Sequence, residues 1–309
     1  MIRLEFLKKS GGYNESFTCQ DGYDLWIKFI THYKVTNVTE PLFSYRRHGL
    51  NLTTNEERIL NTRKKIKELF VDEHLEIPPT LAVIPVRQTF IGKVSWPLFE
   101  WEGKTVIEHK VEDCLQARRI TAIAITSSDT EILEHCREKF AHTENVYVIE
   151  RPRDFENATE TLAKTLEHAL TSIPDWEARF KALMSVSIDY PFVTADIIDD
   201  AVNTLVLFKS DAVLSVRPDN KMYYQHTGHT LTPILDQEKF TRLEREAIYR
   251  GAGGIAAGLI SSFHKNGTLL GGSISHIVVD NKNSFGVFSD FDLQIVKSLQ
   301  TENKEVAIL

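Results

Sequence analysis

From Leu81 to Val216 the chain alternates between short apolar runs and longer segments with helical periodicity. The apolar runs are four to eight residues long, the length of buried strands, while the segments between them place apolar side chains on one helical face. Strands that alternate with helices predict a mainly parallel sheet with helices on both faces, an α/β fold of three layers. The expected strands are 81–85, 120–126, 146–149, 182–188 and 212–216, and the expected helices are 104–117, 130–140, 158–170 and 196–208.

Composition narrows the classes of protein further. A chain of 309 residues with 42% hydrophobic residues can bury a large core, and its formal charge of −7 argues against a nucleic-acid-binding surface. The longest apolar stretch, 252–263, is shorter than the roughly 20 residues of a membrane span. Three widely separated cysteines without a CxxC pair argue against a zinc site and a disulfide framework, and favour a reducing, cytoplasmic setting.

The chain divides into three parts. Residues 1–52 are rich in aromatic side chains, and residues 53–78 form a charged segment without Gly that ends at Pro78-Pro79. In this segment Ile59, Ile66, Leu69 and Phe70 recur at helical spacing, and Thr54 with Glu57 resembles a capping box, so a linking helix is expected. Residues 79–309 carry the α/β pattern.

Two expected strand ends carry candidate functional residues. Arg87 and Lys93 follow the strand that ends at Pro85, where they could hold phosphate groups, although the same loop could be an ordinary basic surface. Asp189 follows the strand 182–188 and would point into the crevice at the carboxyl ends of the strands. A carboxylate there is suited to Mg²⁺, but the alternative is a strand-end turn closed by Pro191.

Two further segments leave alternatives open. Asp290 and Asp292 could approach one metal ion, or they could be the acidic first turn of a helix over 293–299, and we favour the second interpretation. Glu244 and Arg245 precede the glycine cluster that includes Gly253 and Gly254. They could recognise a ligand's hydroxyl and carboxylate groups beside close backbone, or form a salt-bridged loop with a tight turn.

Taken in order, these segments resemble the cytidylyltransferases that activate acylneuraminic and related ulosonic acids as CMP-sugars. The matching segments are Leu81–Arg87, Glu102–Ile107, Ser127–Ile132, Glu150–Pro152 with Ala158-Thr159, and Asp189–Val193. The resemblance implies a GT-A or Rossmann-like nucleotidyltransferase fold, with CTP and an acidic sugar as substrates and Mg²⁺ as cofactor. The residues it assigns are Pro85, Arg87, Gln88, Ser128 and Asp129 for the nucleotide, Arg87, Lys93 and Asp189 for catalysis, Glu244, Arg245, Gly253 and Gly254 for the sugar, and Asp189, Asp290 and Asp292 for the metal. It also implies a homodimer, with partner contacts in the segment 221–235.

The chain departs from the family pattern at two functional places. Gln88, Thr89 and Phe90 follow Arg87, where the family has a Gly- and Ser-containing phosphate loop. Alignment on Asp292-Leu293 puts Gly286 and Phe288 where the family has two metal-binding aspartates. A second hypothesis therefore stands beside the enzyme: a catalytically degenerate module that binds a nucleotide or a sugar next to a glycosyltransferase.

Residues 1–52 resemble a different family, the carboxyl-terminal end of family 2 inverting glycosyltransferases. The matching segments are Gly11–Phe17, Gln20–Trp26 and Pro41–His48, and Asp21 stands where that family carries its acidic pair. About 50 residues bury too little core for a nucleotide-sugar site, so we expect a remnant that packs on the following domain, and glycosyl transfer by this segment is a weaker alternative. A cytidylyltransferase-like domain that follows a glycosyltransferase-like segment suggests a role in surface-polysaccharide synthesis.

Overall fold

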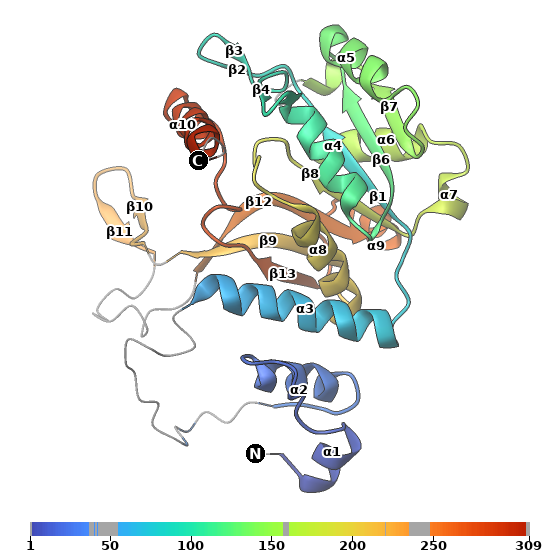
Figure 1. Ribbon diagram of the computed structural model, residues 1–309, viewed down its shortest axis with the longest axis vertical. Coiled ribbons are helices and arrows are strands. Elements are labelled where there is room, and N and C mark those ends of the chain that lie inside the picture. Colours follow the sequence, from blue (N-terminus) through green and yellow to red (C-terminus); the bar gives the residue numbers. More distant parts are fainter. Residues whose placement is uncertain are drawn as a thin grey trace.

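A seven-stranded sheet lies at the centre of the computed structural model, which describes residues 2–36, 40, 42, 55–156, 161–219, 221–234 and 248–306, with side chains to 299 (Figure 1). The strand order is β13-β9-β12-β8-β1-β6-β7. The strands are β1 (Thr80–Pro85), β6 (Ile120–Ser127), β7 (Val146–Glu150), β8 (Ala182–Val186), β9 (Ala212–Asp219), β12 (Ile248–Leu259) and β13 (Ile274–Val278).

The sheet is mainly parallel, as the alternation predicts. β1 pairs in parallel with β6 and β8, β6 with β7, and β9 with β13. The exception is β12, which runs antiparallel between β8 and β9. Since β12 was not among the expected strands, its position between two parallel groups is a finding of the structure.

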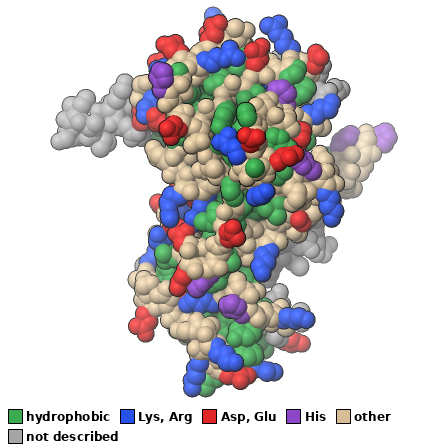
Figure 2. Space-filling view, turned by 90° about the vertical axis from the view of Figure 1, so that its right-hand side faces the viewer, with side chains coloured by type: hydrophobic (Ala, Val, Ile, Leu, Met, Phe, Trp, Pro, Cys, Tyr) green, Lys and Arg blue, Asp and Glu red, His purple; other side chains and the backbone are tan. Residues whose placement is uncertain are grey.

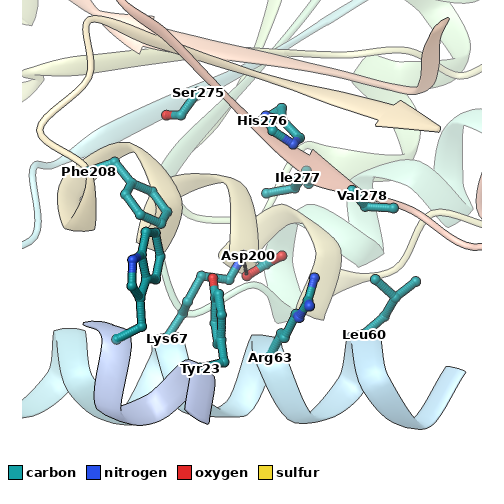
Figure 3. Close-up of a pocket in the computed structure, with 11 residues that line it drawn as sticks. Tyr23, Leu60, Arg63, Lys67, Asp200, Phe208, Ser275, His276, Ile277 and Val278 are labelled. Carbon is teal, nitrogen blue, oxygen red and sulfur yellow. Dashed lines mark ion pairs between the residues drawn. The ribbon is translucent and has the colours of Figure 1, made fainter. Parts of the chain in front are cut away.

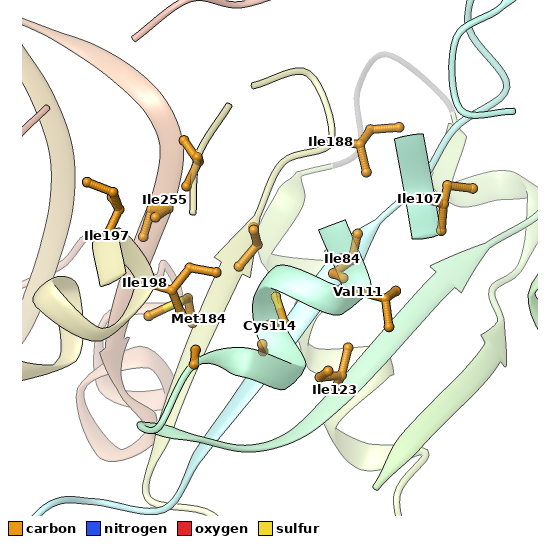
Figure 4. Close-up of a cluster of buried hydrophobic side chains, with 14 of the residues drawn as sticks. Ile84, Ile107, Val111, Cys114, Ile123, Met184, Ile188, Ile197, Ile198 and Ile255 are labelled. Atoms are coloured by element: carbon orange, nitrogen blue, oxygen red, sulfur yellow. The ribbon is translucent and has the colours of Figure 1, made fainter. Parts of the chain in front are cut away.

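Helices cover both faces of the sheet, so the three-layer α/β prediction is confirmed. Along β1, Ala82 and Ile84 face the layer of α4 (Val106–Gln116) and α8 (Ala195–Leu207), while Leu81 and Val83 face α6 (Leu162–Thr171) and α9 (Ile260–Asn266). Figure 4 shows the first of these cores, where Ile107 and Val111 of α4 approach Ile84 and Ile123 of the sheet. The period of two along the strand explains why neighbouring side chains enter different cores.

The predicted helix boundaries shift by a few residues. α5 spans Thr130–Phe140 as expected, whereas α4 begins at Val106 because Lys104 and Thr105 form β5 and pair with β4 (Glu100–Trp101). Thr105 then caps α4 in a capping box with Glu108. α6 begins at Leu162, and the expected start at residue 158 lies outside the described residues.

The segment 2–36 packs on the rest of the molecule through α3 (Glu56–His74). It contains α1 (Leu4–Lys9) and α2 (Asp21–Ile30), and Ile27 of α2 is buried in a cluster with Ile66, Phe70 and Val71 of α3. Leu207, from α8, completes the cluster. The expected cap Thr54 lies outside the described residues, and Asn55 caps α3 by accepting a hydrogen bond from the backbone N–H of Arg58 at 2.9 Å.

A cavity of about 300 Å³ lies between α2, α3 and β13 (Figure 3). In Figure 3, Tyr23 and Arg63 point from α2 and α3 toward His276 and Ile277 of β13. Burial is the largest cause that raises the pKa of Tyr23 to about 12, so this phenol stays neutral at physiological pH. The N-terminal segment thus contributes Tyr23 and Trp26 to a cavity that it shares with α3 and β13.

On the face shown in Figure 2, basic and acidic side chains are interspersed, without a continuous basic area. Within the described part of the chain, no helix is both long enough and apolar enough to cross a membrane. Cys19, Cys114 and Cys136 are buried free thiols.

Candidate functional site

The carboxyl ends of β1 and β6 are held together by a buried arginine. Arg151, only 2% exposed, donates from Nη2 to the carbonyl of Val86 at 2.8 Å and from Nη1 to the carbonyl of Thr126 at 3.1 Å. Its own backbone N–H donates to the Ser127 carbonyl at 2.8 Å. Because charge-assisted hydrogen bonds are strong inside a protein, Arg151 fixes the place where the loops after both strands leave the sheet.

A cavity of about 490 Å³ opens directly above this point. The residues that line it are Arg87, Gln88, Ser128, Asp129, Thr130, Glu131 and Arg153. Among them are Arg87, Gln88, Ser128 and Asp129, all predicted from the sequence as nucleotide-binding residues. Pro85, which completes that predicted group, is the last residue of β1 and pairs with Thr126.

Hydrogen bonds shape the walls of the cavity. Arg87 donates from Nη2 to the carbonyl of Phe155 at 3.3 Å, and the amide of Gln88 lies between Ser95 Oγ at 2.9 Å and Glu131 Oε2 at 3.4 Å. Arg87 is exposed, so its guanidinium reaches solvent at the cavity mouth. Such a fork of N–H donors suits a phosphate group.

Asp129 is the N-cap of α5. Its Oδ1 accepts the backbone N–H of Ile132 at 3.1 Å, and its own N–H donates to Ser127 Oγ at 3.2 Å. The cavity therefore lies at the N-terminus of an 11-residue helix, whose dipole and free N–H groups favour an anion. The side chain of Asp129 contributes to helix capping, and the anion-binding character comes from the helix end and the two arginines.

Lys93 lies outside the cavity lining, in the turn between β2 (Phe90–Ile91) and β3 (Val94–Ser95). The preceding Gly92 has φ of +60°, and a Cβ there would lie 2.5 Å from Asp290 Oδ1. The hairpin tip thus abuts the first residue of α10 (Asp290–Val306), and only glycine permits this approach.

Asp189 stands at the carboxyl end of β8, next to β1 in the sheet. Its Oδ2 accepts a hydrogen bond from Ser187 Oγ at 3.0 Å, and its carbonyl accepts the N–H of Val287 at 2.9 Å. Burial raises the pKa of this carboxyl group above its usual value, while the hydrogen bond from Ser187 partly opposes that shift.

The other two predicted metal ligands have different local roles. Asp292 Oδ2 accepts hydrogen bonds from Ser289 Oγ at 2.7 Å and from the backbone N–H of Phe288 at 3.1 Å, so it ties the first turn of α10 to the residues that precede the helix. Burial alone would raise the pKa of Asp292, but these hydrogen bonds lower it overall. Asp290 faces Gly92.

The three carboxylates are not gathered into one cluster of ligating side chains. Among the residues that the structure describes, no group of three or more Asp, Glu, His or Cys side chains is arranged to hold a metal ion. Gly286 and Phe288, which align with the family's aspartates, offer no oxygen ligand from their side chains. The ring of Phe288 instead packs edge-to-face on Tyr190, with centroids 5.8 Å apart and planes at 78°.

Gly253 and Gly254 belong to β12, where the register with β9 shifts between Gly251 and Ala256. Both glycines have positive φ, and the carbonyl of Gly254 accepts the N–H of Ser187 at 2.9 Å. A bulge in β12 thus lies against the loop that carries Asp189, which places the predicted glycine pair beside the predicted aspartate. Glu244 and Arg245 lie outside the described residues.

Arg153 and Glu131 were not among the predicted site residues, although both line the cavity. Arg153 begins a 3₁₀ turn (Arg153–Glu156) just after Arg151-Pro152. In the sequence, Arg153 is marked only as a basic residue that follows a strand end and a proline. Tyr190, which contacts Gly254 and Phe288, lies in the segment Asp189–Val193, and the sequence assigned it no role.

Comparisons with known proteins show the fold. No model of a known protein family and no curated protein sequence matches this chain. Among solved structures it is similar to CMP:2-keto-3-deoxy-manno-octonic acid synthetase complexed with CTP, with 14% identity and a TM-score of 0.51 over 73% of this chain and 99% of that chain. It is also similar to 4-diphosphocytidyl-2C-methyl-D-erythritol synthase from Anaerococcus prevotii, with 12% identity and a TM-score of 0.51 over 72% of this chain and 96% of that chain. A second structure of a 4-diphosphocytidyl-2C-methyl-D-erythritol synthase gives 12% identity and a TM-score of 0.52 over 72% of this chain and 99% of that chain. The cytidylyltransferase-type fold predicted for this chain is therefore confirmed.

Proposed function

We propose that this protein is a nucleotidyltransferase that joins CMP from CTP to an acidic sugar and releases pyrophosphate. The observation that supports this proposal is the cavity at the ends of β1 and β6, which gathers Arg87, Gln88, Ser128 and Asp129 at a helix N-terminus. The solved structures with this fold include a synthetase complexed with CTP. The glycosyltransferase-like segment before α3 supports a role in surface-polysaccharide synthesis.

In the proposed reaction, a hydroxyl oxygen of the sugar attacks the α-phosphorus of CTP. The new bond joins that oxygen to the α-phosphorus, the bond between the α-phosphorus and its bridging oxygen to the β-phosphate breaks, and the hydroxyl proton passes to solvent. Arg87 and Arg153 would hold the phosphate oxygens at the N-terminus of α5. Lys93, in the β2–β3 turn outside the cavity lining, would have to approach from that turn to neutralise the leaving pyrophosphate. Catalysis of this kind consists of positioning and charge stabilisation.

The sugar would lie toward β8 and β12. Asp189 and the pair Gly253-Gly254 are brought together there by the hydrogen bond between Ser187 and Gly254. Glu244 and Arg245, which precede β12 in the chain, would contact its hydroxyl and carboxylate groups.

The direct experiment measures pyrophosphate release from CTP with a panel of ulosonic and sialic acids. Turnover with at least one acid is expected, and Arg87→Ala should lower it by about two orders of magnitude, as loss of one charge-stabilising donor typically does. Arg137→Ala is the matched control, because Arg137 pairs with Glu150 on the exposed outer surface at 3.4 Å and lies outside the cavity lining. Equal activity of the two variants would remove Arg87 from the proposed role.

A second candidate is a module that binds a cytidine nucleotide without transferring it. The Phe288–Tyr190 contact at the place of the family's metal aspartates favours this alternative. Nucleotide binding in calorimetry together with no pyrophosphate release from any sugar acid would select it.

We also propose a homodimer that forms through the hairpin of β10 (Tyr224–His226) and β11 (Leu231–Pro233). This hairpin projects from the body in Figure 1 and exposes Met222, Tyr224, Leu231 and Ile234 by 48 to 62%. Light scattering should give a molar mass twice that of one chain. The variant Leu231→Asp should have the mass of a single chain. A wild-type monomer at micromolar concentration would contradict the dimer.

A further inference from the structure

An aromatic contact occupies the position at which the resemblance places two metal-binding aspartates. Phe288 is 65% exposed and packs on Tyr190, which itself closes against Gly254. A Cβ on Gly286 would overlap the rings of Phe288 and Tyr190. The glycine and the two rings are therefore one packed unit, in which a carboxylate at position 286 has no room while Phe288 is present.

Two of the neighbouring carboxylates already accept hydrogen bonds from their own surroundings. Asp292 accepts hydrogen bonds from Ser289 and Phe288, and Asp189 accepts one from Ser187. Asp290 lies against the Gly92 turn, on the side of the β2–β3 hairpin. Asp292 and Asp189 would thus have to share their carboxylate groups between these hydrogen bonds and a divalent cation.

The charges that line the cavity have a consequence for its ligand. Arg87 and Arg153 are balanced by Asp129 and Glu131, so the described lining carries no excess positive charge. A phosphate monoester carries roughly −1.5 to −2 charge at pH 7, and a triphosphate carries more. Without a divalent cation, a lining with no excess positive charge and one helix N-terminus compensates the charge of a monophosphate more fully than that of a triphosphate.

We propose that this site binds cytidine nucleotides without a divalent cation and takes the monophosphate, free or esterified to a sugar, at least as tightly as the triphosphate. The proposal rests on the proposed function in one respect, namely that a cytidine nucleotide occupies the cavity. It adds that the site is built for the CMP portion that substrate and product share.

The experiment is calorimetric titration of the whole chain with CMP and with CTP, each in MgCl₂ and in EDTA at matched ionic strength. The dissociation constant of CMP should change by less than twofold between the two buffers, and CTP should bind no more tightly than CMP in either. A tenfold or greater strengthening of CTP binding by Mg²⁺ would overturn the inference and leave the proposed function standing. If neither nucleotide binds in either buffer, the proposed function fails and this inference fails with it.

Two variants sharpen the result. Gly286→Asp combined with Phe288→Asp removes the ring that excludes a side chain at 286 and supplies two carboxylates, so CTP binding should become at least tenfold tighter in Mg²⁺ than in EDTA. Phe288→Ala removes the same ring and adds no ligand, so its nucleotide binding should stay independent of Mg²⁺. Metal dependence in Phe288→Ala would contradict the inference, because the existing carboxylates would then suffice. The wild-type comparison decides the question even where the double variant does not fold.

Discussion

The ammonium group of Lys67 lies 2.6 Å from Asp200 Oδ1, and both side chains are almost completely buried between α3 and α8. Lys67 also donates to Thr204 Oγ1 at 2.9 Å, so the charge is satisfied by two groups of the same helix. The pair fixes α3, and with it the N-terminal segment, to the outer face of the α/β body.

We expect Lys67→Ala to lower the free energy of unfolding by about 3–5 kcal/mol, because Asp200 would remain as a buried charge without its partner. Denaturant unfolding monitored by tryptophan fluorescence measures this loss. Lys65→Ala is the matched control on the same helix, since Lys65 pairs with Glu68 at the surface and should cost about 0–1 kcal/mol. Equal losses for the two variants would show that the buried pair has no special role.

Ile27→Ala tests whether the N-terminal segment is an integral part of the fold. Ile27 is fully buried against α3 and α8, so its truncation should cost about 2–5 kcal/mol. Leu4, which is 64% exposed, serves as control, and Leu4→Ala should stay within about 0.5 kcal/mol of the wild type. An unchanged global melting transition in Ile27→Ala would mean that residues 2–36 unfold separately from the body.

Gly254→Ala should destabilise the protein by about 1–3 kcal/mol and weaken nucleotide or sugar binding. Its φ is +61°, and the added Cβ would lie 2.5 Å from the Tyr190 ring and 2.7 Å from Ser187. Gly251→Ala lies in the same strand, with no atom within 4 Å of the new Cβ, and should be tolerated. Thermal melts and titrations of both variants distinguish a specific contact from a general need for glycine in β12.

The ion pairs between α3 and Arg118-Arg119 predict a loss of stability in acid. Burial alone would raise the pKa of Asp72, but hydrogen bonds from Arg119 and Arg118 lower it overall. A carboxyl group whose folded pKa is lowered contributes its full stability above its unfolded pKa, about 3.9, and loses it as the pH falls through the lower folded value. Melting temperatures should therefore fall as the pH drops below about 4, and Asp72→Asn should show a smaller fall. A parallel decline in both proteins would assign the acid sensitivity to other groups.

The central part of the fold follows from the sequence because its strands are continuous apolar runs. β1 and β6 bury alternate residues in two cores, so both faces select apolar side chains and the run has no polar interruption. β12 could not be predicted in the same way. Its glycines form a bulge and its first residues are exposed, so neither periodicity nor composition marks a strand.

The same contrast applies to the candidate site. Arg87 and Asp129 follow parallel neighbours, so the sequence places them at one edge of the sheet, and both line the cavity. Arg153 escaped prediction because its position depends on the burial of Arg151, a long-range property. For Asp292 the sequence left metal binding and helix capping open, and the structure shows that its carboxylate accepts hydrogen bonds from Ser289 and Phe288.

The position of Arg151 determines which parts of this fold can vary in sequence. Because its guanidinium satisfies the carbonyls of Val86 and Thr126 from beneath, the strand ends keep their positions whatever loop follows them. The hairpin around Gly92 could therefore differ in length or sequence at little cost to the sheet. Because Arg151 holds the strand ends, the residues of the loops can change without a change in the sheet. The ligand that the loops bind can therefore differ between proteins that share this fold.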